Sequence, residues 1–132
     1  MNPLVQVKER LLRHPELRFV ETATSIDIQP PSADGFGVGI RVVPHGYIVS
    51  FEGWHEEYAT AEEALNCVAF AFSGESRLAV TYRGPVPVKW SLERLHGGQW
   101  YLESETGLIL QPFWLRRRVV YRKNPNLLDP AA

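Results

Sequence analysis

One stretch of the chain has apolar residues at the three- and four-residue spacing of an α-helix, and helix-end signals stand at both of its ends. Thr60 is followed three residues later by Glu63, a spacing that lets the two residues satisfy each other's free N–H groups at a helix start. Gly74 comes after the pattern, and glycine is common just beyond a helix end. The apolar positions in between are Ala64, Leu65, Val68, Ala69 and Phe72. The pattern therefore predicts a capped helix over residues 61–73.

A shorter helix is predicted at the N-terminus. Asn2 can cap it, and Pro3 suits the first helical position because that residue needs no N–H donor. The pair His14-Pro15 should end it, since the residue before a proline avoids helical backbone angles. Its apolar stripe consists of Leu4, Val7 and Leu11, with Val5 and Leu12 beside them.

Most of the remaining chain alternates between apolar and polar residues with a period of two, which is typical of β-strands. The predicted strands span residues 17–29, 39–43, 47–53, 77–83, 86–93, 100–105 and 113–122. The sequence His96-Gly97-Gly98-Gln99 is the strongest hairpin signal, and Pro44-His45-Gly46 predicts another. Successive hairpins favour an antiparallel sheet.

The sequence therefore predicts an α+β fold: a curved, mostly antiparallel sheet of about six to seven strands, with the helix at about 61–73 packed on it. The short N-terminal helix packs across this body, and the last four strands are expected to form a meander. A chain of 132 residues suits one domain, placed at residues 1–124, with 125–132 expected as a frayed C-terminal tail. The segment Cys67–Phe72 is apolar all round, so either the curled sheet or a second subunit should enclose it.

Composition narrows the function classes. A formal net charge of −1 argues against wholesale binding to nucleic acid or to an anionic membrane. No apolar run approaches the length of about 18 residues that a membrane-spanning helix needs. The single cysteine, Cys67, excludes an intrachain disulfide and a multi-cysteine zinc site, and we expect it in the core. We expect a cytoplasmic protein with no cofactor, no bound metal and no membrane partner.

The sequence contains one incomplete catalytic motif. His55-Glu56 begins the zinc-protease motif H-E-x-x-H, but Ala59 occupies the place of its second histidine. His45, Trp54, His55 and Glu56 could still come together in a pocket between the sheet and the helix, where desolvation would raise the pKa of a carboxyl group. These four residues are the candidate pocket.

The last predicted strand places Trp114, Arg116, Arg118 and Arg122 on one side. Arginines two positions apart on a strand lie about 6.6–7 Å from each other, a spacing that suits phosphate groups, and a tryptophan can stack on a base. These four residues are the candidate anion-binding strip. A competing interpretation pairs the arginines with glutamates of neighbouring strands in a charge ladder. Arg117 falls on the opposite side of this strand, among apolar residues.

These observations leave three functional hypotheses. The enclosed helix end, the many aromatic residues and the lack of a complete catalytic motif favour a small non-enzymatic protein-interaction or assembly module, with a protein partner or a second copy. One alternative is a nucleic-acid or polyanion binder that uses the last basic strand. The other is a small-molecule-binding protein or enzyme with a pocket between sheet and helix.

Overall fold

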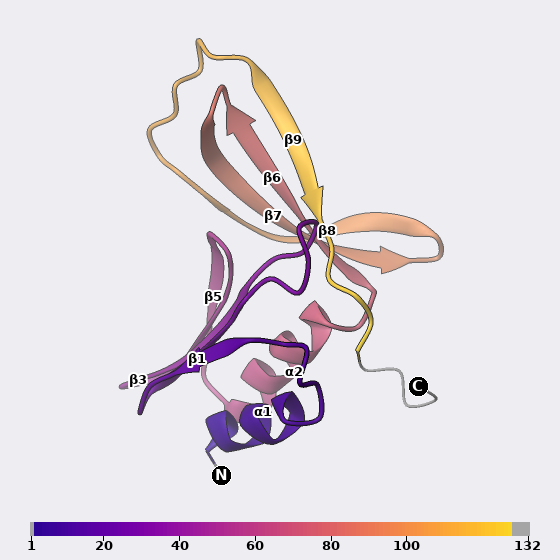
Figure 1. The fold of residues 1–132 in the computed structure, drawn as a ribbon. Helices are drawn as coiled ribbons and strands as arrows, with labels where there is room; N and C mark the ends of the chain where they lie inside the picture. The colour runs from indigo at the N-terminus through magenta and orange to yellow at the C-terminus, as the bar shows by residue number, and fades with distance from the viewer. Residues whose placement is uncertain (1, 128–132) are drawn as a thin grey trace.

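The computed structural model describes residues 2–127, which form two helices and two antiparallel sheets (Figure 1). The helices are α1 (Pro3–Leu11) and α2 (Ala61–Ala71). Sheet A has the order β1 (Phe19–Glu21), β2 (Ser25–Ile28), β3 (Val38–Val43), β4 (Gly46–Phe51) and β5 (Trp54–Tyr58). Sheet B has the order β8 (Gln99–Gly107), β7 (Val86–His96), β6 (Ser76–Arg83) and β9 (Arg117–Arg122). The α+β class and the antiparallel pairing are confirmed, but nine strands in two sheets replace the expected single sheet.

Both helices begin at the residues that the sequence indicates. The Glu63 N–H donates to the Thr60 hydroxyl oxygen at 3.2 Å, and that hydroxyl donates to the Glu63 carboxylate at 2.9 Å. At the start of α1, the Leu4 N–H donates to the Asn2 side-chain oxygen at 2.9 Å, with Pro3 at the first helical position. The capping side chains therefore satisfy N–H groups that have no partner inside the helix.

Two predicted strand boundaries in sheet A are wrong. Residues 17–29 do not form one strand, because a turn after Glu21 folds them into the hairpin β1–β2, and the Thr22 N–H donates to the Ser25 carbonyl at 2.9 Å. Strand β4 ends at Phe51, and a two-residue turn leads directly into β5. The residues Trp54–Tyr58 are thus a strand at the edge of sheet A, which is not among the strands predicted from the sequence.

Strands β6, β7 and β8 form the predicted meander, but β9 departs from it. It starts at Arg117 instead of residue 113, and it pairs with β6 on the far side of the sheet from β8. The spatial order β9-β6-β7-β8 is that of a Greek key, in which the fourth strand returns beside the first. A long connection must therefore carry the chain from one edge of sheet B to the other.

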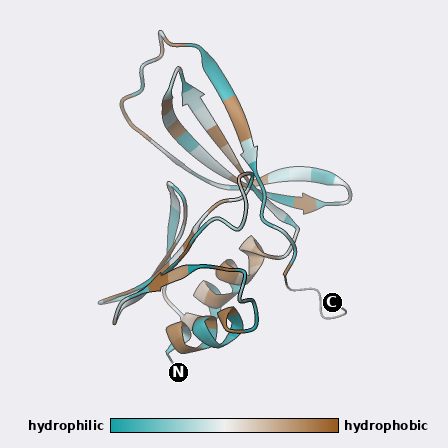
Figure 2. Cartoon of the chain, viewed as in Figure 1, coloured by the Kyte–Doolittle hydropathy of each residue, from teal (hydrophilic) through white to brown (hydrophobic). Residues whose placement is uncertain are grey.

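The main core lies between sheet A and the two helices, which cover one face of that sheet (Figure 1). Figure 2 shows hydrophobic colours along much of α2. The core continues into sheet B through Leu78, Val80 and Leu92. Trp54 is fully buried, and its indole N–H donates to the Ser104 hydroxyl at 3.1 Å, so this one side chain joins the two sheets.

The C-terminal end of α2 is enclosed, as predicted, and the same chain encloses it. The Arg94 guanidinium lies 4.1 Å from the centre of the Phe70 ring. The Leu127 N–H donates to the Phe72 carbonyl at 2.8 Å, and Phe72 is buried. Of the predicted frayed tail, residues 128–132 lie outside the described part of the chain. Neither helix within residues 2–127 has the length and hydropathy needed to cross a membrane.

Candidate functional site

The connection between β8 and β9, residues 108–116, is the longest irregular segment of sheet B, and we call it the crossover. It passes around the β6–β7 turn along the outer border of the sheet (Figure 1). At its start the Leu108 N–H donates to the Val88 carbonyl at 2.8 Å, and at its end the Gly84 N–H donates to the Arg116 carbonyl at 2.8 Å. Both ends are therefore held to the β6–β7 hairpin by backbone hydrogen bonds.

The crossover exposes several large apolar side chains side by side in sequence. The exposed fraction is 96 % for Ile109, 87 % for Leu110 and 84 % for Trp114. Together with the exposed side chains of Leu108 and Phe113, these residues form what we call the crossover surface. Exposed apolar residues that are scattered singly are normal, but five large ones within seven residues of an exposed segment favour a contact site.

Arginines flank the crossover surface, and their charge is not compensated by nearby carboxylates. Arg116 and Arg117 are exposed, and neither forms an ion pair within residues 2–127. The Arg118 guanidinium lies 4.6 Å from the Tyr82 ring, and the Arg83 guanidinium lies 5.6 Å from the ring of Phe113. The surface therefore combines apolar contact area with net positive charge.

The predicted charge ladder along the last strand is wrong, because β9 lies beside β6 and not beside β8. The glutamates of β7 and β8 pair with other basic residues, among them Glu105 with Lys89 at 3.6 Å and Glu93 with Arg77. The third such pair joins Glu103 to Arg94. This pairing explains why the arginines next to the crossover have no carboxylate partner in the described chain.

The candidate anion-binding strip is divided between two places. Trp114 and Arg116 belong to the crossover, whereas Arg118 and Arg122 lie on β9 and share the sheet face of Tyr82. The Arg122 guanidinium donates to the Ala33 carbonyl at 2.7 Å and lines a cleft of about 550 Å³ between sheet B and the loop before β3. Arg122 is thus engaged in joining the two sheets.

Arg117 is exposed and points away from Arg118, on the same side as Val119 and Tyr121. On this side of β9, Arg117 is opposite Arg83 of β6, at the end of the pairing next to the crossover. Arg117 therefore needs no buried carboxylate partner, although it shares its side with apolar residues.

The residues of the candidate pocket occupy different parts of sheet A. His45 is exposed in the β3–β4 turn, and His55 and Glu56 are exposed on β5, where His55 is opposite Ser50. Trp54 is buried in the core. None of the four lines the cleft beside Arg122 or the groove described below. Within residues 2–127, histidine, cysteine, aspartate and glutamate side chains form no cluster of three or more suited to a metal ion.

Cys67 lies in the core, as predicted, and its surroundings keep the thiol protonated. Burial raises the pKa of the Cys67 thiol to about 12. Burial, together with the neighbouring Cys67 and Glu56, also raises the pKa of Tyr58, whose hydroxyl donates to the Glu56 carboxylate at 2.8 Å. A thiol that stays protonated at neutral pH is a poor nucleophile, so Cys67 contributes packing instead of reactivity.

The crossover surface carries a signal that sequence reasoning did not use. Residues 108–115 read Leu-Ile-Leu-Gln-Pro-Phe-Trp-Leu, an apolar run with neither period-two nor helical spacing and with a proline in its middle. Such a run fits neither a half-buried strand nor an amphipathic helix. The second half of this run, residues 113–115, coincides with the beginning of the last strand predicted from the sequence.

Comparisons of the chain with protein-family models, with curated proteins and with solved structures found no match. The function proposed below therefore rests on the residues and contacts of this chain alone.

Proposed function

We propose that this chain is a small, non-enzymatic protein-interaction module and that it docks its partner on the crossover surface. The supporting observation is a group of five exposed apolar side chains on a segment whose two ends are hydrogen-bonded to sheet B. Tryptophan and arginine are over-represented among the residues that dominate binding energy at protein interfaces. The crossover presents Trp114 and Arg116 close together in sequence.

The charge around the crossover surface defines the chemistry of the partner. Arg116 and Arg117 are exposed and have no carboxylate partner in the described chain. A protein surface with an apolar depression and a rim of carboxylates complements these groups, because opposite potentials speed docking and exclude wrong partners. Such a partner would receive Trp114 and Ile109 as anchors.

Removing two anchors should abolish the interaction. In Ile109→Ser/Trp114→Ser, the loss of both apolar side chains should weaken binding by about 30-fold or more, since one dominant interface residue is worth about 2 kcal/mol. The partner captured by the wild-type chain is identified, purified and titrated by calorimetry against both proteins. Sedimentation of the chain alone, in both forms, shows whether the partner is instead a second copy.

The matched control is Leu12→Ser/Val20→Ser, which also removes two exposed apolar side chains. Leu12 lies directly after the end of α1, and Val20 lies on β1. It should change the affinity by less than about threefold, because isolated exposed residues contribute little. The proposal fails if the purified partner binds the crossover variant as tightly as the wild type. It also fails if the wild-type chain binds no protein and remains a monomer at high concentration.

A second candidate, a polyanion-binding function, is favoured by one observation. Trp114 is 84 % exposed and stands two residues from Arg116, so a base could stack on the indole while the guanidinium contacts a phosphate. The ligand would then be a single-stranded nucleic acid. Its negative phosphates would complement the same arginines as the carboxylates of an acidic protein.

Single-stranded oligonucleotides test this candidate directly. Binding to the wild-type chain should weaken as the salt concentration rises, because phosphate contacts release counterions. The variant Arg116→Ala/Arg118→Ala should lose most of this binding, whereas Arg18→Ala/Arg41→Ala, which removes two exposed arginines elsewhere, should retain it. Fluorescence anisotropy of a labelled oligonucleotide gives both affinities. Absence of binding at low salt would eliminate the candidate.

A further inference from the structure

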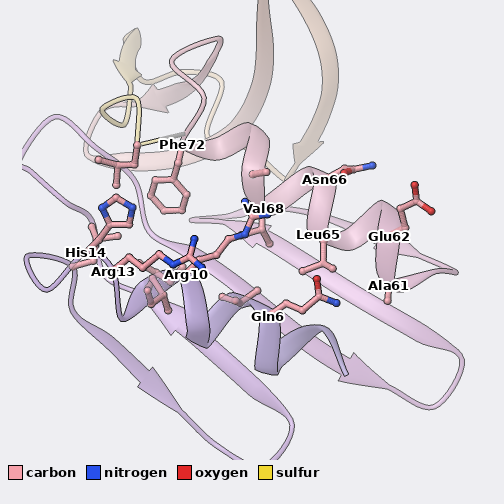
Figure 3. Close-up of a pocket in the computed structure, with 16 residues that line it drawn as sticks. Gln6, Arg10, Arg13, His14, Ala61, Glu62, Leu65, Asn66, Val68 and Phe72 are labelled. Carbon is pink, nitrogen blue, oxygen red and sulfur yellow. The ribbon is translucent and has the colours of Figure 1, made fainter. Parts of the chain in front are cut away.

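A groove of about 890 Å³ runs between α1 and α2, far in sequence from the crossover (Figure 3). Apolar side chains of both helices line it, including Val7 and Leu11 from α1 and Leu65 and Val68 from α2, with Phe72 directly after the end of α2. Small-molecule sites typically have volumes of about 300–1,000 Å³ and mainly apolar walls. The groove therefore has the size of a site for one small ligand, and its walls combine apolar and polar side chains.

Basic side chains gather on the α1 side of this groove. Arg10, Arg13 and His14 line it, and Figure 3 shows the two arginines lying next to each other, near Val68. Neither Arg10 nor Arg13 forms an ion pair within residues 2–127, whereas His14 lies 3.3 Å from the Glu16 carboxylate. Glu62 also lines the groove, at the start of α2, but it forms no ion pair with Arg10 or Arg13 and lies away from them in Figure 3. The two guanidinium groups beside the apolar wall are therefore complementary to a bound anion.

We propose that the α1–α2 groove binds a small amphiphilic anion, a molecule with an apolar body and a single carboxylate or phosphate group. The apolar body lies against Leu65, Val68 and Phe72, and the anionic group is held by Arg10 and Arg13. Arginine suits this role because its planar guanidinium can donate two parallel hydrogen bonds to a carboxylate or a phosphate. Burial of the apolar body supplies affinity, and the arginines select the charge and orientation.

This site is separate from the crossover surface. The groove is lined by α1, α2 and residues of the segments next to them, whereas the crossover surface lies on sheet B between β8 and β9. A variant of either site should therefore leave binding at the other unchanged, and failure of the proposed protein interaction would not remove the groove ligand.

Two fluorescent naphthylamines that differ by one charge provide the test. Anilinonaphthalene sulfonate carries an apolar aromatic body and one anionic group, and phenylnaphthylamine is its uncharged parent. The wild-type chain should bind the anion at least about tenfold more tightly than the neutral compound, because hydrogen bonds to charged groups are the strong ones. Decanoate and decyl phosphate, used below their micelle concentrations, should displace it, and their relative affinities identify the preferred headgroup.

Three variants locate the binding. Arg10→Gln/Arg13→Gln should remove the preference for the anion while leaving the affinity for phenylnaphthylamine unchanged. Ala69→Phe, which places a ring in the groove, should weaken the binding of both compounds. Arg18→Gln, which removes an exposed arginine outside the groove, should change neither affinity.

Two results would overturn the proposal. One is equal binding of the charged and uncharged compounds by the wild-type chain. The other is that Ile109→Ser/Trp114→Ser loses anion binding while Arg10→Gln/Arg13→Gln retains it. This result would place the bound anion on the crossover surface. Circular dichroism of each variant confirms that the helices are intact, so that a loss of binding reports on the groove.

Discussion

Replacing Trp54 with alanine should lower the free energy of unfolding by about 3–5 kcal/mol, the usual cost of truncating a buried aromatic residue. Trp54 is fully buried, and its ring centroid lies 4.7 Å from that of Phe51. Its indole N–H also donates to Ser104 on β8, so the variant loses a contact between the two sheets as well as core volume. Urea denaturation followed by far-ultraviolet circular dichroism measures the change.

Trp114→Ala is the matched control, because it truncates the same kind of side chain at an 84 % exposed position. It should change the free energy of unfolding by no more than about 0.5 kcal/mol, as substitutions away from packed features generally do. Equal destabilisation by Trp54→Ala and Trp114→Ala would contradict the burial of Trp54 at the junction of the two sheets.

Gly46→Ala should destabilise the fold by about 3 kcal/mol or more, for two separate reasons. Gly46 has φ +155°, a conformation that residues with a side chain rarely adopt. A Cβ atom there would also lie 2.3 Å from the Tyr58 carbonyl oxygen of the neighbouring strand β5. A backbone atom inside a sheet cannot move away without breaking the pairing, so chemical denaturation should show a large loss of stability.

Gly98→Ala is a comparison variant that has an unfavourable φ but no close contact. Gly98 also has a positive φ, +78°, but no atom lies within 4 Å of the position that its Cβ would occupy. This variant should lose only the conformational contribution, about 1–2 kcal/mol. The difference between the two variants combines the contact with Tyr58 and the greater strain of φ +155°, and a Gly98→Ala as damaging as Gly46→Ala would argue against that contact.

The starts of the two helices and the β3–β4 and β7–β8 turns could be predicted because their causes lie within a few residues. The cap of α2 needs only Thr60 and Glu63, and both of its hydrogen bonds span three residues. The β7–β8 hairpin needs only Gly97 and Gly98, whose positive φ angles glycine adopts without strain. Local signals of this kind do not depend on the rest of the fold.

The side of the sheet on which Trp54 lies could not be predicted in this way. When residues 47–53 are taken as one strand, Trp54 falls on the side opposite to Phe51. The chain instead turns at Glu52 and Gly53, so that Trp54 on β5 is paired with Phe51 on β4 and lies on the same face. Two residues in a turn therefore changed the inferred position of a core residue.

The candidate sites depended even more on long-range pairing. Trp114 and Arg116 were expected on a strand, but β9 begins at Arg117, because its residues pair with β6 from Leu78 to Arg83. The partner residues of the two strands lie between 34 positions (Arg83 and Arg117) and 44 positions (Leu78 and Arg122) apart in the chain. The exposure of the crossover surface follows from this pairing, since the chain must pass around a hairpin to reach the far edge of sheet B.

By itself, the amino-acid sequence determined the α+β class, the starts of both helices and the β3–β4 and β7–β8 turns, because side chains near in sequence specify these features. Only the tertiary structure decided that the strands divide into two sheets, that β9 returns beside β6, and that the basic groove forms between α1 and α2. The physical reason is that strands pair through backbone hydrogen bonds, which are chemically the same for every alternating segment. The choice of partners therefore depends on how all the apolar faces pack together at once.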